Sequence, residues 1–207
     1  LSFKLANEGS LAFRGHLEVV RYERTTHIDW DTLVGPELRH ARYRQSFDFD
    51  LFMLRGDVDW VHNFEDSGRL ETKLSLSGNH EDNAFREQGF SPDGMQNLDD
   101  ETDGRLRIHG VNSTGKYSLP TMGEHRLEAG WEGSISRRRE NRAQRLLPFE
   151  GQPASSSDLL FEAQIRRLAF YGQDEWTVGP NWSMYLGVRW EHLETISKGD
   201  DFATVRN

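Results

Sequence analysis

NWSMYLGVRWEHLE, the stretch from Asn181 to Glu194, alternates between apolar and polar residues. Its even positions are Trp182, Met184, Leu186, Val188 and Trp190, and its odd positions are Ser183, Tyr185, Gly187, Arg189 and Glu191. Successive side chains of a β-strand point to opposite faces, so this period of two predicts a strand with one apolar and one polar face. The mean hydropathy of the chain is only −0.76, so the fold depends on what covers this apolar face.

The same alternation recurs in four further segments. Their apolar positions are Leu11, Phe13, Leu17 and Val19; Phe52, Leu54, Val58 and Trp60; Leu70, Leu74 and Leu76; and Leu127, Ala129, Trp131 and Ile135. Two segments are less regular. Between Arg105 and Leu119 neither parity is wholly apolar, and Asp174 shares a parity with Phe170 and Trp176. A β-bulge or a position at the rim of a sheet would explain either departure.

Short turns and long polar loops separate these segments. Turn-forming residues gather near residues 6–9, 65–68, 120–124 and 178–181. Longer polar stretches lie near residues 28–40, 86–102 and 142–159, and they contain Pro36, Pro92, Pro148 and Pro153. Because short and long connections alternate, the chain is predicted to form about eight antiparallel, up-and-down strands, with short turns at one end and long loops at the other.

Composition excludes several classes of protein. A formal net charge of −9 argues against a nucleic-acid partner, because binding phosphates requires a basic surface. The chain has no cysteine, and therefore no disulfide, thiolate metal site or cysteine nucleophile. None of its windows offers the run of about 20 apolar residues that a membrane helix requires.

Two all-β architectures fit these patterns. In a soluble sandwich or propeller the apolar faces pack on another sheet, but the connections are not usually sorted by length. In a transmembrane barrel the apolar residues face lipid, the polar residues face the lumen, and the short turns lie at the periplasmic end. We therefore predict an all-β, antiparallel, up-and-down transmembrane β-barrel segment over residues 1–207. The predicted lipid-facing residues are Leu54, Val58, Leu74, Leu76, Leu127, Ala129, Met184, Leu186 and Val188. The predicted lumen-facing residues are Arg55, Asp57, Glu71, Lys73, Arg126, Glu132, Arg189 and Glu191.

The positions of the aromatic residues agree with a barrel. Trp182 and Trp190 are separated by about 26 Å along an extended strand, which is close to the span of an apolar band when the strand is tilted. The predicted aromatic girdle consists of Trp60, Tyr117, Trp131, Trp176, Trp182 and Trp190. The alternative interpretation is that these aromatic residues pack over the hairpin ends of a soluble β-protein.

Three stretches carry a resemblance to a known family. LAFYGQDEWTVGPNWSMYLGVRWEHLE, residues 168–194, resembles the strand-turn-strand unit of TonB-dependent outer-membrane receptors, with a Y-x-Q-D-E-W-like strand, a short turn and a G-x-R-W-E strand. RGDVDWVHNFEDSGRLETKLSLSG, residues 55–78, and GKYSLPTMGEHRLEAGWEGSISRR, residues 115–138, are similar to upstream hairpins of the same barrels.

The resemblance implies a large barrel in the cell outer membrane that imports a scarce nutrient such as a metal chelate. It also implies four partners: outer-membrane lipid and lipopolysaccharide, a plug domain with the remainder of the barrel, an inner-membrane energy-coupling protein that acts through the plug, and a small ligand. No plug domain and no energy-coupling box are recognised in residues 1–207, so the chain is expected to be an internal part of such a barrel.

Candidate chemical sites are few. SRRRENRAQR, residues 136–145, places Arg137, Arg138, Arg139 and Arg142 near the outer end of a hairpin, where they would contact lipopolysaccharide phosphates or an anionic ligand. A solvated loop base is the alternative for this run. DETDG, residues 100–104, resembles part of a calcium loop. If Asp99 begins the twelve-residue template, however, the twelfth position is Gly110 and not the required glutamate. We expect no catalytic residues, no metal site and no cofactor, and hence no enzyme.

Two alternatives to a receptor barrel remain at this stage. One is a small, self-closed, eight-stranded outer-membrane barrel with a structural or adhesion role, since eight strands can close by themselves. The other is an outer-membrane enzyme, which would need a catalytic cluster at the outer rim. Strand pairing tests the first alternative, because closure would join the strand near Phe3 to the strand near Val188.

Overall fold

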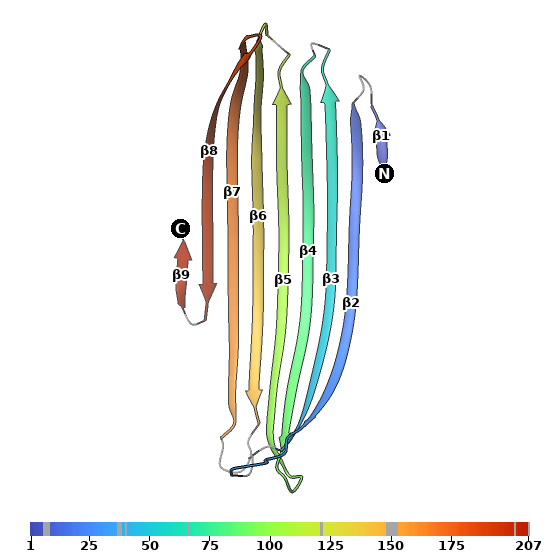
Figure 1. Ribbon diagram of the computed structural model, residues 1–207, viewed down its shortest axis with the longest axis vertical. Helices are drawn as coiled ribbons and strands as arrows, with labels where there is room; N and C mark the ends of the chain where they lie inside the picture. Colours follow the sequence, from blue (N-terminus) through green and yellow to red (C-terminus); the bar gives the residue numbers. More distant parts are fainter. Residues whose placement is uncertain are drawn as a thin grey trace.

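Each strand of the chain pairs with its neighbours in sequence, and together the strands form one antiparallel sheet (Figure 1). The computed structural model describes residues 1–5, 9–36, 39, 41–65, 67–120, 122–147, 153–200 and 202–206. The strands are β1 (Ser2–Lys4), β2 (Ser10–Asp29), β3 (Arg42–Asn63), β4 (Arg69–Phe90), β5 (Gln96–Ser118), β6 (His125–Leu146), β7 (Ser155–Gly179), β8 (Trp182–Gly199) and β9 (Phe202–Arg206). The predicted all-β, antiparallel, up-and-down fold is thus confirmed, with seven long strands and two short ones.

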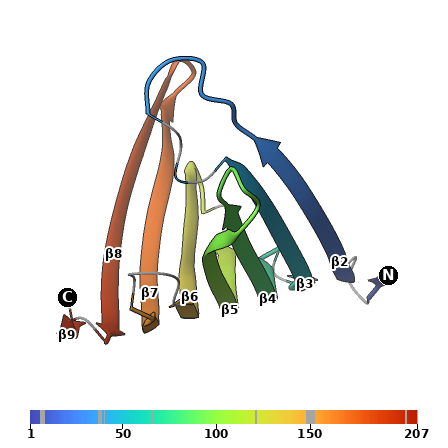
Figure 2. The same cartoon turned by 90° about the horizontal axis from the view of Figure 1, so that it is seen from below.

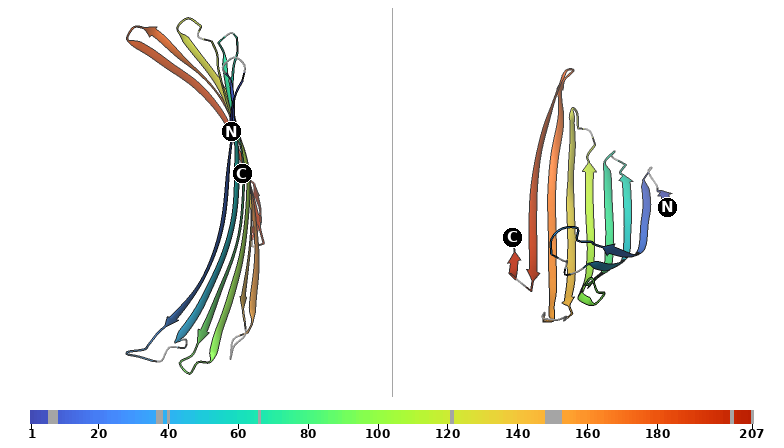
Figure 3. Two further views of the ribbon diagram at one scale, coloured as in Figure 1. Left: turned by 90° about the vertical axis from the view of Figure 1, so that its right-hand side faces the viewer. Right: turned by 60° about the horizontal axis from the view of Figure 1, so that its bottom comes forward.

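The sheet is curved but open. Seen along the strands it forms an arc with β1 and β9 at its two ends (Figure 2), and seen from the side it is bent along its length (Figure 3). In the described part of the chain β1 pairs only with β2, and β8 pairs with β7 and β9. The pairing of the Phe3 strand with the Val188 strand, which self-closure at eight strands would require, is therefore not formed in this sheet.

The strand register gathers the apolar positions of the alternating segments on one face, although a few apolar residues such as Met53 and Val61 lie on the other. Residues that oppose each other in an antiparallel ladder point to the same side, so a row of partners marks one face. One such row, read from β2 to β8, is Leu11, Trp60, Thr72, Gly115, Trp131, Phe170 and Trp190. We call this side the apolar face and the opposite side the polar face. A slip of one residue in any strand would move that strand's apolar residues to the polar face.

The apolar face is uncovered. Trp182, Leu186 and Val188 are 77%, 74% and 75% exposed, and among the described residues only the hydrophobic side chain of Ala169 is buried. The sheet is therefore a single layer without a core. An apolar surface this continuous marks a site of contact with lipid or with another protein.

The strands extend further than the sequence predicts. Strands β2–β8 contain between 18 and 25 residues, whereas crossing a membrane takes about 9–11 residues. The long loops expected near 28–40, 86–102 and 142–159 shrink to connections over 30–41, 91–95 and 147–154. Their outer parts belong to the ladder, where for example Arg86 pairs with Glu101. Polar residues predominate there, and the apolar residues that remain, such as Phe47 and Phe85, lie on the opposite parity to the apolar band. The alternation of the band therefore ends in the sequence although the backbone pairing continues.

The connection between β2 and β3 crosses the ends of neighbouring strands (Figures 1 and 2). The Asn97 side chain donates a hydrogen bond to the carbonyl oxygen of Arg39 at 2.8 Å. This contact fastens the connection to the first residues of β5. At the opposite end of the sheet the connections are short, as expected near 65–68, 120–124 and 178–181, although Asp66 and Thr121 lie outside the described residues. Most of the expected turn at 6–9 also lies outside them.

The two irregular segments have different causes. Strand β5 has no register shift between Arg105 and Leu119; instead the indole of Trp131 lies over Gly115, and its Nε1 donates to the Ser113 hydroxyl at 3.2 Å. The neighbouring strand thus supplies the apolar surface that β5 lacks. Asp174 lies near the short-turn end, where its carboxylate is 2.8 Å from His125 Nδ1, so a rim position explains it.

No helix among the described residues combines the length and the apolar character needed to cross a bilayer.

Candidate functional site on the polar face

The polar face carries the charged residues that the sequence assigned to a lumen. One row of opposing residues on this face, read from β3 to β8, is Asp59, Lys73, Thr114, Glu132, Ala169 and Glu191. The register also places Arg55, Asp57, Glu71, Arg126 and Arg189 on this face. Strand alternation alone therefore brings the eight predicted lumen residues to one side. Whether that side faces a lumen stays a prediction.

One cluster on this face joins β6, β7 and β8. The Arg189 guanidinium donates two hydrogen bonds to the carboxylate of Glu132, at 3.2 and 2.8 Å. Arg167 lies 3.8 Å from Glu132 and donates to Glu191 at 2.5 Å. Positive and negative groups alternate in space, so the cluster is close to neutral. Each side chain is more than a third exposed, and such ion pairs contribute about 0–1 kcal/mol each in water.

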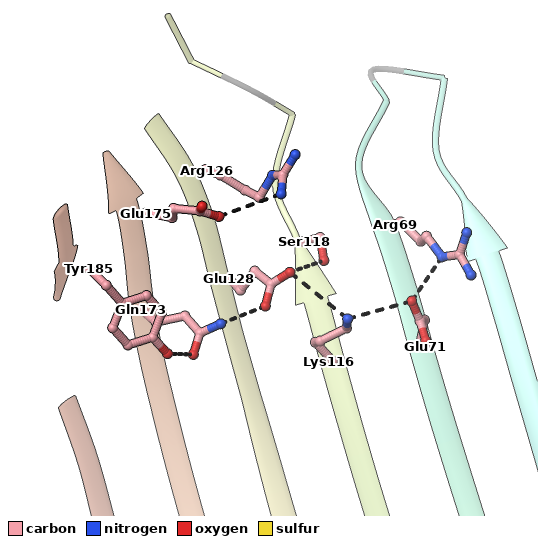
Figure 4. A network of polar contacts seen from close by, with 9 residues as sticks. All are labelled: Arg69, Glu71, Lys116, Ser118, Arg126, Glu128, Gln173, Glu175 and Tyr185. Carbon is pink, nitrogen blue, oxygen red and sulfur yellow. Dashed lines mark hydrogen bonds and ion pairs between the residues drawn. The ribbon is translucent and has the colours of Figure 1, made fainter. Parts of the chain in front are cut away.

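A second cluster lies nearer the short turns and spans β4 to β8 (Figure 4). The Lys116 ammonium sits between two carboxylates, 3.8 Å from Glu71 and 3.9 Å from Glu128. Arg69 lies on the far side of Glu71 at 2.9 Å. Sequence reasoning named Glu71 in this cluster but missed Lys116, because β5 shows no clear alternation.

Neutral groups complete the second cluster. Gln173 donates to Glu128 at 2.7 Å and accepts a hydrogen bond from the Tyr185 hydroxyl, while the Ser118 hydroxyl donates to Glu128 at 3.2 Å. Next to them, a shallow hollow of the polar face is lined by Lys116, Glu128, Tyr185 and Arg189, among others. The arrangement offers water-accessible charges and amides of both signs, which suits polar contact with a second protein segment or a hydrated solute.

The residues predicted to face lipid and to form the girdle all lie on the apolar face. At the short-turn end, Trp176 stacks on His125 with ring centroids 5.2 Å apart, and Phe64 meets Tyr117 edge to face. Trp190, which lies eight residues beyond Trp182 on β8, stacks with Phe170, and the two ring centroids are 6.1 Å apart. Contact of these rings with membrane interfaces stays a prediction.

Strand alternation divides the arginine run of β6. Arg137 and Arg139 lie on the apolar side, opposite His109 and Arg107 of β5, whereas Arg138 and Arg142 lie on the polar side. The sequence treated the four arginines as one group because it placed them near a loop. The ladder in fact continues through Leu146, so neighbouring arginines point in opposite directions.

The calcium-loop resemblance at residues 100–104 is not realised as a loop. These residues lie within β5, and Asp100 accepts a hydrogen bond from Gln144 at 3.1 Å. Within the described parts of the chain, no three histidine, aspartate or glutamate residues form a group that would hold a metal ion.

An ion pair fastens the outer end of the β4–β5 hairpin, well beyond the apolar positions of both strands. Arg86 donates two hydrogen bonds to Asp99 at 2.7 Å, and Gln96 adds one at 3.1 Å. Asp99 is buried. The Arg86 guanidinium holds the pKa of this carboxyl below its usual range, and burial opposes the shift without cancelling it.

This lowered pKa makes a testable difference between the wild type and Asp99→Asn. A carboxyl with a depressed pKa in the folded state stabilises the fold above its unfolded pKa of about 3.9, and that contribution is lost as the pH falls through the folded value. We therefore expect Asp99→Asn to be less stable than the wild type at pH 7 and the gap to narrow below about pH 4. The midpoints of urea unfolding of both proteins, at pH 7 and below about pH 4, measure this difference in stability. A gap that stays constant, or widens in acid, would contradict this role for Asp99.

Comparison with known proteins gives a family. A sequence model described as "TonB dependent receptor-like, beta-barrel" matches residues 7–207. A search of curated protein sequences gave no match. Among solved structures, the chain is similar to the "Crystal structure of ferric citrate transporter FecA in the unliganded form", with 12% identity and a TM-score of 0.37. The alignment covers 99% of this chain and 38% of that one, so the chain spans well under half the length of this transporter. Because the family model covers nearly the whole chain, the chain belongs to the TonB-dependent receptor-like β-barrel family.

Proposed function

We propose that this chain forms part of the barrel wall of a TonB-dependent outer-membrane receptor that imports a scarce nutrient such as a metal chelate. The observation that carries the proposal is the separation of an apolar face and a polar face on one curved sheet, in a chain that the family model matches over residues 7–207. A barrel wall needs one face for lipid and one for a wet interior. The open sheet also leaves both edges available to further strands, as a wider barrel requires.

In this proposal the chain has a passive part in transport. The polar face supplies the wall against which a plug domain sits, and the clusters around Lys116 and Arg189 supply contacts of both signs for it. The inner-membrane energy-coupling protein acts through the plug, and the ligand is held by plug and outer loops together. Lipid and lipopolysaccharide surround the apolar face. No catalytic role is proposed for any residue.

Uptake measurements on cells test this function. We expect deletion of the gene that encodes the chain to abolish energy-dependent accumulation of at least one chelate in a panel of radiolabelled ferric citrate, ferric hydroxamate and cobalamin, and a plasmid copy to restore it. A protonophore should abolish the same accumulation. Unchanged accumulation of every chelate after deletion, under metal or cobalamin starvation, would refute the proposal.

Cysteine labelling tests the orientation of the sheet. The chain has no cysteine, so Pro92→Cys and Pro153→Cys each create a single thiol in the connections between long strands. We expect both to react with an impermeant maleimide on intact cells, because barrels of this kind keep short turns on the periplasmic side. Glu65→Cys, in a short turn, is the matched control and should react only after the outer membrane is ruptured. The reverse pattern would invert the topology.

A further inference from the structure

A group of cations lies on the apolar face directly beyond the apolar band. On β5, β6 and β7 the apolar band of this face ends at Val111, Ile135 and Leu168, although Leu160 lies on the same face further along β7. The next positions toward the long connections, each about 7 Å further along the strand, are basic: His109, Arg137 and Arg166. We call the residues Arg107, His109, Arg137, Arg139 and Lys198 the basic belt; together they line one hollow of about 610 Å³.

The register sets like charges against each other within the basic belt. Arg107 of β5 lies directly opposite Arg139 of β6, which sets two guanidinium groups side by side, and the imidazole of His109 lies opposite Arg137. Like charges directly opposite in a ladder are destabilising. An anion placed between the two strands would remove this repulsion.

Protein carboxylates do not neutralise the basic belt. Glu162 is the carboxylate that contacts it, and it is shared between Lys198 at 2.6 Å and Arg139 at 3.5 Å. Arg107 donates to Nδ1 of His80 at 3.2 Å, and the carboxylate of Asp82 at the other nitrogen of that ring is shared with Arg105. In the described part of the chain Arg137 has no hydrogen-bond or ion-pair partner. Four full positive charges therefore share one negative charge.

We infer that the basic belt binds the phosphate groups of an anionic glycolipid in the outer leaflet. This inference rests on the proposed function, because it requires the apolar face to meet lipid and the long connections to face outward. Acyl chains would then contact Val111, Ile135 and Leu168, and the phosphates of the same molecule would lie at the height of the basic belt. Arginine suits this task, since its planar guanidinium binds phosphate oxygens in pairs.

The chain contains a matched control for this site. Arg126 and Arg142 lie on the same strand but on the polar face, and neither lines the hollow of the basic belt. The double variant Arg137→Gln/Arg139→Gln removes two charges from the basic belt. Arg126→Gln/Arg142→Gln removes the same net charge from the opposite face.

The experiment uses the full receptor in detergent, with bis-phosphorylated lipid A as the probe and retained lipid measured by native mass spectrometry. We expect Arg137→Gln/Arg139→Gln to weaken binding about tenfold or more and Arg126→Gln/Arg142→Gln to leave it within about twofold, because a lost charge-assisted contact is worth at least a factor of ten. Arg137→Lys/Arg139→Lys, which keeps the charge, should restore part of the binding. Equal losses in the two glutamine variants would refute the site.

Two further arms identify the source of the phosphate. Dephosphorylated lipid A should bind the wild type as weakly as phosphorylated lipid A binds Arg137→Gln/Arg139→Gln. Inorganic phosphate at millimolar concentration should not displace the lipid, because it lacks the acyl contacts. Displacement by inorganic phosphate, or equal binding of both forms of lipid A, would overturn the inference.

Chelate uptake is measured separately in the same variants. Failure of uptake in the wild type refutes the transport function, whereas failure of lipid A retention refutes only the basic belt.

Discussion

Replacing Val188 with arginine is expected to destabilise the membrane-inserted barrel by about 2–4 kcal/mol, the cost of a cation on the lipid face near the bilayer midplane. Val188 lies on the apolar face of β8, between Trp182 and Trp190, and is 75% exposed there. Its direct partner on β7 is Gly172, and the nearest carboxylate on this face, Asp174, already contacts His125. The free energy of unfolding of the full barrel in lipid vesicles, from urea titration, measures the effect.

The control is the same substitution one residue earlier. A Cβ atom at Gly187 would lie 3.6 Å from its nearest neighbours, an ordinary contact, and would point to the polar face. We therefore expect Gly187→Arg to change the free energy of unfolding by well under half as much. Arg189→Leu should also be milder than Val188→Arg, because Arg167 remains close to Glu132. Equal costs for Val188→Arg and Gly187→Arg would show that the apolar face does not meet lipid.

Adding a methyl group at Gly130 is expected to cost about 1–3 kcal/mol, the range for overpacking a site that cannot relax. A Cβ atom there would approach the carbonyl oxygen of Gly115 and the ring of Tyr171 more closely than 3.0 Å. The ring can move, but the oxygen belongs to the backbone of the paired strand β5. The same vesicle titration measures the cost in Gly130→Ala.

Gly133→Ala is the matched control, on the same strand. The nearest atoms to a Cβ at Gly133 are 3.8 Å away, so the added methyl meets only ordinary contacts. We expect no loss of stability for this variant and a small gain from its reduced backbone freedom in the unfolded state. If Gly130→Ala proves as stable as Gly133→Ala, the backbones of β5 and β6 are not held as closely at this point as the structure describes.

The sequence predicted the faces of the sheet better than its ends. Alternation from Trp182 to Glu191 identified a strand because an apolar residue at every second position is a local signal. Beyond the apolar band the signal vanishes: Arg86 and Glu101 are ladder partners, yet polar residues on both faces read as a loop. Backbone hydrogen bonds hold those strand ends together, and the polarity of the side chains does not reveal these bonds.

Contacts between strands were also beyond the sequence. Lys116 meets Glu71 and Glu128 only because the register aligns three strands, and a register depends on pairing that a single sequence does not display. The division of the arginine run followed from one such fact, the continuation of β6 to Leu146. The predicted lumen residues share one face of the sheet, because parity within a strand is local, and their contact with a lumen stays a prediction.

The absence of a core changes what mutation can do to this protein. In a packed interior, each side chain is restrained by the volume of its neighbours, and the loss or gain of a methylene is felt. Among the described residues of this sheet Ala169 is the one buried hydrophobic side chain, and most other side chains are at least partly exposed to the surrounding medium. Most positions on either face are thus free to exchange size and shape as long as they keep their preference for oil or water. We expect sequence drift in such a wall to be fast and to keep parity, and to be slowest at glycines such as Gly130, where two backbones meet.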